Sequence, residues 1–193
     1  MKNCNKEEHS FEITTEERAA LFPIILREYN PAYPQWFAEE KSNIERLVGV
    51  GNIVRISHIG STAVPGLLAK PTVEVLLEIA DNADVEALIA AMPSEYICLT
   101  GSALTMPTPP PHLCILKGYT STGFAEKVFH IHVRYSGDWD ELHFRDYLVA
   151  HPETAEQYAA LKRELFERFE HDRDGYTEAK GDFIRKVTGR TRQ

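Results

Sequence analysis

Residues 58–78, HIGSTAVPGLLAKPTVEVLLE, decide the fold because a bend rich in glycine, serine and proline joins two strand-like runs. The runs at residues 52–59 and 72–79 are rich in the β-branched residues typical of strands. Between them, residues 60–66 have the composition of a loop. The stretch therefore predicts two strands joined by a short connection.

The bend carries the residues that point to chemistry. Gly60 lets the backbone approach a phosphate closely, and Ser61 and Thr62 follow it with backbone and hydroxyl donors. Glu74 lies in the next strand, where a carboxylate facing the bend can hold a divalent ion against phosphate oxygens. We therefore expect phosphate binding at the bend, with Ser61 and Glu74 as candidate catalytic residues. An ordinary turn between two strands explains the same residues on spacing alone.

Working outward, the remaining patterns alternate between helix and strand. The predicted helices cover residues 15–28, 34–48, 83–92 and 138–186, and the further strands cover 96–100, 112–117 and 127–135. Breaks are expected in the last helical region at His151-Pro152 and Asp174-Gly175. This order predicts an α+β fold, a mixed sheet flanked by helices with helices at both chain ends. Residues 1–28 are expected as a helical extension before a main domain over 29–193.

Composition narrows the classes of function. The chain has 193 residues and a formal net charge of −8, which disfavours general binding to nucleic acid but permits a small phosphorylated ligand in a local basic pocket. Cys4, Cys98 and Cys114 lie far apart, without the spacing of a disulfide framework or a zinc site. Charged residues, among them Lys6, Glu7, Glu8 and Glu12, stand where a signal peptide would need an apolar core, and no apolar run is long enough for a membrane span. The sequence therefore predicts a cytoplasmic protein and leaves its oligomeric state open.

Two histidines suggest a metal. His130 and His132 alternate on one predicted strand face and can converge on one ion, with Glu74 as a third ligand from a neighbouring strand. Nitrogen and oxygen ligands together suit Zn²⁺, Mn²⁺ or Ni²⁺, while the carboxylate beside a phosphate suits Mg²⁺. Alternatively, one histidine packs in the core and the other bonds to a backbone carbonyl.

Lysines interrupt the apolar stripes of the C-terminal helices. Lys162 lies on the stripe four residues after Tyr158, and Lys180 lies four residues after Tyr176. A lysine on an inward face needs an anionic partner or a route to water. With Lys70 beside the bend, the two can form a cationic wall around a phosphate; snorkelling to solvent is the alternative.

Arg145 is a further candidate for phosphate binding, because a guanidinium can clamp a phosphate through two hydrogen bonds. The competing interpretation is a structural ion pair with a neighbour such as Asp146.

The chain also resembles the GrpB family, a branch of the nucleotidyltransferase superfamily that shares its fold with DNA polymerase beta. The resemblance extends over residues 29–187. It rests on residues 58–78 and on four later motifs: His130-Ile131-His132-Val133, residues 144–148, Tyr158 with Leu161-Lys162, and Tyr176 with Lys180 and Phe183-Ile184. It implies a small mixed sheet with flanking helices, which agrees with the element order above.

The resemblance implies a protein that binds a nucleotide or another phosphorylated small molecule, with nucleotidyl transfer as an activity that a divalent metal would assist. Superfamily transferases carry two carboxylates at alternate positions after the Gly-Ser loop. Here Glu74 is the first, and Leu76 occupies the second position. Leu76 therefore leaves a catalytically degenerate binding or assembly module as one alternative to transfer. The histidine pair suggests another, a metal-dependent hydrolase of a small phosphate compound.

Overall fold

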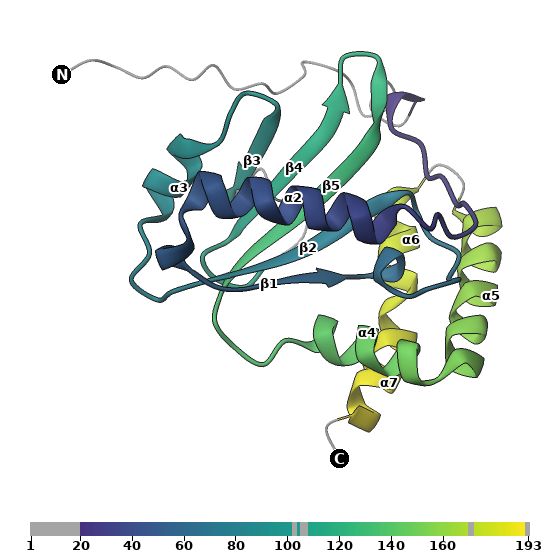
Figure 1. Cartoon of the computed structure of the whole chain (residues 1–193). Helices are drawn as coiled ribbons and strands as arrows, with labels where there is room; N and C mark the ends of the chain where they lie inside the picture. The colour runs from purple at the N-terminus through teal and green to yellow at the C-terminus, as the bar shows by residue number, and fades with distance from the viewer. Residues whose placement is uncertain (1–19, 102–103, 105–107, 170–171, 192–193) are drawn as a thin grey trace.

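A five-stranded mixed sheet forms the centre of the molecule. The computed structural model describes residues 20–101, 104, 108–169 and 172–191. Its strands are β1 (Ile53–Ile59), β2 (Thr72–Ile79), β3 (Tyr96–Thr100), β4 (Leu113–Thr120) and β5 (Gly123–Tyr135). They lie in the order β1-β2-β5-β4-β3 (Figure 1), with β2 and β5 parallel and every other neighbouring pair antiparallel. The predicted mixed sheet is confirmed.

One face of the sheet packs under α2 (Tyr33–Val48), with α3 (Val85–Ala91) beside it (Figure 1). The odd-numbered residues of β2, from Val73 to Ile79, point to this side and join Ile44 and Val48 of α2 in the largest apolar core. Because side chains alternate along a strand, the even-numbered residues of β2 point to the opposite face. That alternation delivers Glu74 to the side away from α2.

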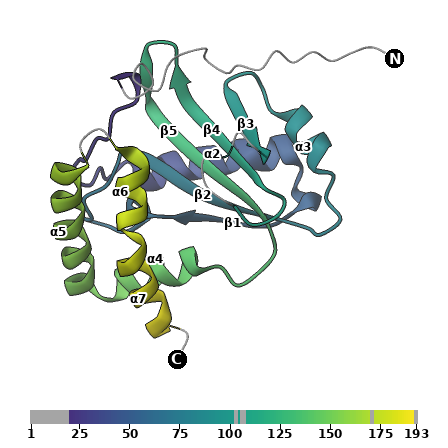
Figure 2. The ribbon, with the colours of Figure 1, turned by 180° about the vertical axis from the view of Figure 1, so that it is seen from behind.

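Four helices follow β5 and gather at one end of the sheet, beside the bend after β1 (Figures 1 and 2). They are α4 (Asp140–Ala150), α5 (Pro152–Arg168), α6 (Arg173–Ala179) and α7 (Gly181–Thr191). Their apolar residues form a second core with Val64, Leu67 and Leu68, the residues that follow the bend. Two short 3₁₀ turns, Val50–Asn52 and Ser61–Ala63, flank β1. The bend is therefore held between the sheet and the C-terminal helices.

The expected break at His151-Pro152 is confirmed, while the one at Asp174-Gly175 is wrong. Gly175 lies inside α6, where its backbone N–H donates to the side chain of Asp172, which caps the helix. A glycine in a capped first turn does not end a helix. The helices instead end at Arg168 and Ala179.

The predicted N-terminal helix is also wrong over residues 22–28. Only residues 20 and 21 are helical in this part, and residues 1–19, where the helix was expected to begin, lie outside the described residues. Arg27 forms an antiparallel bridge with Ala69, exchanging two backbone hydrogen bonds of 2.8 and 2.9 Å. This tertiary pairing, together with Pro23, replaces the helical pattern.

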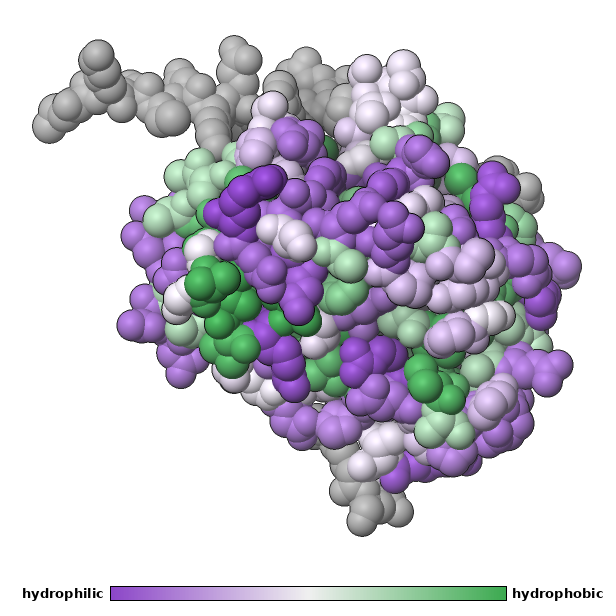
Figure 3. All heavy atoms as spheres, viewed as in Figure 1, coloured by the Kyte–Doolittle hydropathy of each residue, from purple (hydrophilic) through white to green (hydrophobic). Residues whose placement is uncertain are grey.

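Within the described residues, no helix has both the length and the apolar character needed to cross a membrane. The face seen in Figure 3 is largely hydrophilic, with apolar residues in small separate patches. Among the residues that the structure describes, the large apolar side chains that remain exposed are Val50, Val54 and Val149.

Candidate functional site

Glu74 lies directly against the bend. Ile59 pairs with Glu74 in the β1–β2 ladder, so Gly60 follows at the point where the chain leaves the sheet. Gly60 has a φ of 69°, and a Cβ placed on it would overlap the carboxylate of Glu74, 2.8 Å from Cδ. Only glycine allows this approach, because any side chain would displace the acid. The predicted apposition of Glu74 and the bend is therefore present.

Lys162 of α5 points into the same region. Its side chain is buried, with the residue 2% exposed. The ammonium group donates to Ser61 Oγ at 2.9 Å and to the carbonyl oxygen of Leu68, and it lies 4.6 Å from the centre of the Tyr158 ring. The snorkelling alternative is thus wrong for Lys162, which joins the two ends of the loop that follows β1.

Burial alters the chemistry of Lys162. Desolvation first, and the neighbouring charge of Lys180 second, lower the pKa of Lys162 to about 7, while Glu74 acts in the opposite direction. A buried ammonium without a full counter-charge gains by meeting an anion. At neutral pH the site therefore holds a lysine that a bound anion would keep protonated.

Two more lysines meet at a buried tyrosine of α6. Tyr176 is 0% exposed, and the Nζ atoms of Lys180 and Lys70 lie 4.5 and 5.7 Å from the centre of its ring. Within the described part of the chain its hydroxyl has no hydrogen-bond partner, and burial raises the pKa of Tyr176 to about 12. Lysines from three separate segments are thus brought to one end of the sheet.

The histidine pair has a different arrangement from the predicted metal site. His130 is the register partner of Glu74 on the parallel strand β5, and its ring lies 6.5 Å from that of His132. His130 Nε2 and the Tyr119 hydroxyl are hydrogen-bonded at 2.7 Å. Burial lowers the pKa of His132, which favours the neutral imidazole.

In the described ranges, no three His, Cys, Asp or Glu side chains are grouped so that they could hold a metal ion. A site formed by Glu74, His130 and His132 therefore needs side chains to move, and it stays a prediction.

Thr62 and Arg145 are engaged inside the protein. The Thr62 hydroxyl donates to the carbonyl oxygen of Thr72 at 3.2 Å and lies 3.0 Å from His58 Nε2. Burial, and next the charge of Arg145, lower the pKa of His58 to about 4. Arg145 donates to the carbonyl oxygen of His58 at 2.8 Å and pairs with Asp146, as its competing interpretation expected. These contacts hold the bend in place, and a phosphate-binding role for either side chain stays a prediction.

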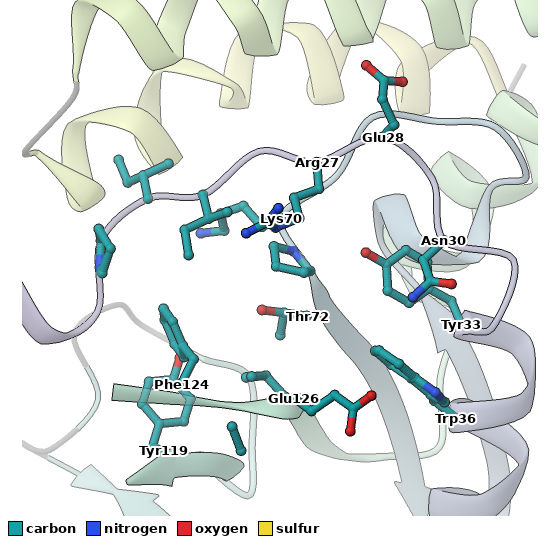
Figure 4. Close-up of a pocket in the computed structure, with 16 residues that line it drawn as sticks. Arg27, Glu28, Asn30, Tyr33, Trp36, Lys70, Thr72, Tyr119, Phe124 and Glu126 are labelled. Atoms are coloured by element: carbon teal, nitrogen blue, oxygen red, sulfur yellow. The ribbon is translucent and has the colours of Figure 1, made fainter. Parts of the chain in front are cut away.

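Sequence reasoning missed a cavity of about 360 Å³ next to Lys70 (Figure 4). Arg27, Trp36, Tyr119 and Phe124 line it. Its walls come from residues 23–30, α2 and the β4–β5 hairpin, which lie far apart in the sequence, so no local pattern could have revealed it.

Fold and site together define an α+β protein whose mixed sheet ends at a Gly-Ser bend, one carboxylate and three lysines. The chain belongs to the GrpB family, whose model, described as "GrpB protein", matches residues 23–190. The resemblance found in the sequence is therefore confirmed at the level of the family.

Individual relatives agree with that membership. A UPF0157 protein of Pseudomonas aeruginosa is 35% identical over 163 residues, covering 83% of this chain and 64% of that protein. A dephospho-CoA kinase of Mycolicibacterium paratuberculosis is 27% identical over 181 residues, covering 80% of this chain and 43% of the kinase. This chain thus spans less than two thirds of either relative.

The crystal structure of the conserved protein GrpB from Enterococcus faecalis superposes with a TM-score of 0.70 at 28% identity. The match covers 86% of this chain and 96% of that one.

Proposed function

We propose that this chain binds a phosphorylated small molecule at the Gly60-Ser61 bend. The observation that carries the proposal is the buried ammonium of Lys162, which bonds Ser61 Oγ at 2.9 Å and has Lys180 and Glu74 within electrostatic range. A phosphate that accepts from Lys162 and Ser61 would supply the counter-charge that the protein provides only in part. Lys70 and Lys180 would add positive charge at the Tyr176 side.

Binding, and not two-metal transfer of a nucleotidyl group, is the function that the carboxylates favour. A two-metal mechanism needs ligands that clamp two ions about 4 Å apart. Leu76, at the expected second position, is buried against Ile59 and Leu142. Glu78 is fully buried and held by Arg55 and by the backbone N–H of Gly137. Glu74 is thus left as the acid at the bend.

The name of one relative supports a phosphorylated ligand. The Mycolicibacterium relative is named dephospho-CoA kinase, which denotes phosphoryl transfer to a phosphorylated compound. Because this chain covers only 43% of that protein, the name supports a phosphorylated ligand in general and no particular substrate.

Calorimetric titration with inorganic pyrophosphate tests the proposal. Lys162→Met should weaken binding roughly tenfold or more, because a hydrogen bond from a charged donor contributes about 1.5–3 kcal/mol. Ser61→Ala should weaken it less. Lys186→Met serves as the matched control, since Lys186 is an exposed lysine of α7 and its loss should leave binding unchanged. Equal affinity in wild type and Lys162→Met, with both proteins folded, would overturn the assignment.

A further inference from the structure

The cavity beside Lys70 has the size and lining of a small-molecule site. Its volume of about 360 Å³ falls within the roughly 300–1,000 Å³ typical of ligand pockets. Figure 4 shows Trp36 on one side, Tyr119 and Phe124 on the other, and the side chains of Lys70 and Arg27 along the wall between them. A flat molecule entering this space would have aromatic surfaces on two sides and cations on a third.

The aromatic wall is fixed before any ligand arrives. Phe22, Tyr119 and Phe124 pack against one another with ring centres 5.0 to 5.2 Å apart. The Tyr119 hydroxyl is bonded to His130, and on the opposite side Trp36 meets Tyr33 edge to face at 5.5 Å. Side chains held in this way lose little freedom on binding, which favours affinity for a rigid ring.

Polar groups around the cavity can form hydrogen bonds with the edge of a bound ring. Asn30 Oδ1 accepts from the backbone N–H of Ala32, so the amide NH₂ is the end of that side chain left to donate. Thr72 and Glu126 also line the cavity, providing a hydroxyl and a carboxylate. Such a mixture of aromatic faces and edge donors and acceptors suits a nucleobase better than a sugar or a lipid chain.

Lys70 connects the cavity to the phosphate site. It lines the cavity, and its Nζ also lies 5.7 Å from the centre of the Tyr176 ring, which Lys180 approaches from 4.5 Å. A ligand with its ring in the cavity would thus direct an attached phosphate along Lys70 toward the other lysines.

We propose that the phosphorylated ligand is a nucleotide, with its base between Trp36 and the Tyr119–Phe124 wall and its phosphates on the Lys70 side. This inference rests on the proposed function, because it assigns the ligand of the same site.

Comparing AMP, ribose 5-phosphate and pyrophosphate by calorimetry tests the inference, because AMP and ribose 5-phosphate differ only in the base. Wild type should bind AMP roughly tenfold more tightly than ribose 5-phosphate, the gain expected from stacking one base. Trp36→Leu should abolish that difference while leaving pyrophosphate binding within twofold. Phe124→Leu should do the same, and it provides a second variant should Trp36→Leu fail to fold.

Fluorescence gives an independent readout. The chain has two tryptophans, Trp36 and Trp139. In Trp139→Phe the emission therefore comes from Trp36, and it should change with ADP and with adenosine but not with pyrophosphate.

The possible failures are distinguishable. Should AMP and ribose 5-phosphate bind equally, or Trp36→Leu weaken all three ligands alike, the base site is refuted while phosphate binding stands. Should adenosine alter Trp36 emission while Lys162→Met has no effect on pyrophosphate, the cavity stands and the proposed function fails.

Discussion

The ammonium group of a surface lysine is hydrated, whereas that of Lys162 is buried and donates hydrogen bonds to Ser61 Oγ and to the carbonyl oxygen of Leu68. Its inward position was predictable, because the apolar stripe of α5 passes through it. Its partners were not, because Ser61 precedes it by about a hundred residues and the contact depends on how α5 packs against the bend. A sequence pattern indicates that a charge is buried, and only the tertiary structure shows what surrounds it.

The lowered pKa of Lys162 predicts a pH dependence of stability. The pKa is about 7 in the folded protein against an ordinary value of 10.5, so between these values the unfolded chain binds more protons and stability rises with pH. From pH 7 to 9 the free energy of unfolding of wild type should rise by about 2 kcal/mol relative to that of Lys162→Met. Urea denaturation across this range measures it. Lys186→Met should keep the wild-type slope, and identical pH profiles for wild type and Lys162→Met would contradict the prediction.

Gly60 allows a second prediction with two matched glycines. At Gly60 the φ is positive and an added Cβ would overlap Glu74. At Gly66 the φ is also positive, but no atom lies within 4 Å of an added Cβ. At Gly51 the φ is not positive and an added Cβ would again have no atom within 4 Å. Gly51→Ala should alter the free energy of unfolding by less than about 0.5 kcal/mol, and Gly66→Ala should lower it by roughly 1–2 kcal/mol. Gly60→Ala should cost more than Gly66→Ala and should also weaken pyrophosphate binding, because Glu74 must move. Equal costs for Gly60→Ala and Gly66→Ala would show that the Glu74 contact is unimportant.

At the scale of elements, local sequence patterns predicted where strands begin and end, but they did not predict which strands pair. β2 and β3 match their predicted ranges, because alternating and β-branched residues mark strands wherever they lie. β5 begins four residues before its predicted start, at Gly123, because its hairpin with β4 extends the strand. The parallel pairing of β2 with β5 joins segments separated by two other strands, and no short-range signal encodes it. That pairing is nevertheless what places His130 beside Glu74.

The ion pair between Arg55 of β1 and Glu78 of β2 yields a prediction about how these strands are held. Glu78 is 0% exposed and also accepts from the Gly137 N–H, 3.2 Å away in the turn before α4. Arg55→Met should destabilise the fold by about 2 kcal/mol or more, because the buried carboxylate loses its counter-charge. Adding Glu78→Leu should recover most of this loss.

A double-mutant cycle in urea measures the coupling between Arg55 and Glu78. The exposed pair Lys41–Glu45, 3.8 Å apart, is the control, and Lys41→Met should cost less than about 1 kcal/mol. Should Arg55→Met also cost less than that, Glu78 does not depend on the ion pair, and its availability as a second acid at the site would have to be reconsidered.

At the scale of the whole molecule, segments distant in sequence meet around one end of the sheet. The bend follows β1, Glu74 and His130 come from β2 and β5, and the lysines come from the loop before β2 and from the C-terminal helices. Residues 23–30 complete the cavity by crossing to Ala69. The motifs of the family resemblance include most residues of the proposed phosphate site. The cavity was not predictable, since its aromatic residues each look like ordinary core positions.

The backbone bridge between Arg27 and Ala69, by which residues 23–30 cross to the loop before β2, yields a prediction that distinguishes the proposed base site from the proposed phosphate site. Arg27 donates its backbone N–H to the buried carbonyl of Ala69, and proline at this position removes the donor. Arg27→Pro should therefore lower the free energy of unfolding by about 1–3 kcal/mol, the cost of an unpaired buried carbonyl. Arg27→Ala loses the same side chain but keeps the hydrogen bond, so the difference between the two variants isolates the contribution of the backbone bridge to Ala69.

In calorimetry, Arg27→Pro should bind ADP more weakly than Arg27→Ala does, while both bind pyrophosphate alike, because Lys162 and Ser61 are unchanged. If the two variants bind ADP equally, the crossing does not shape the base site and the cavity wall must be held by α2 and the β4–β5 hairpin alone.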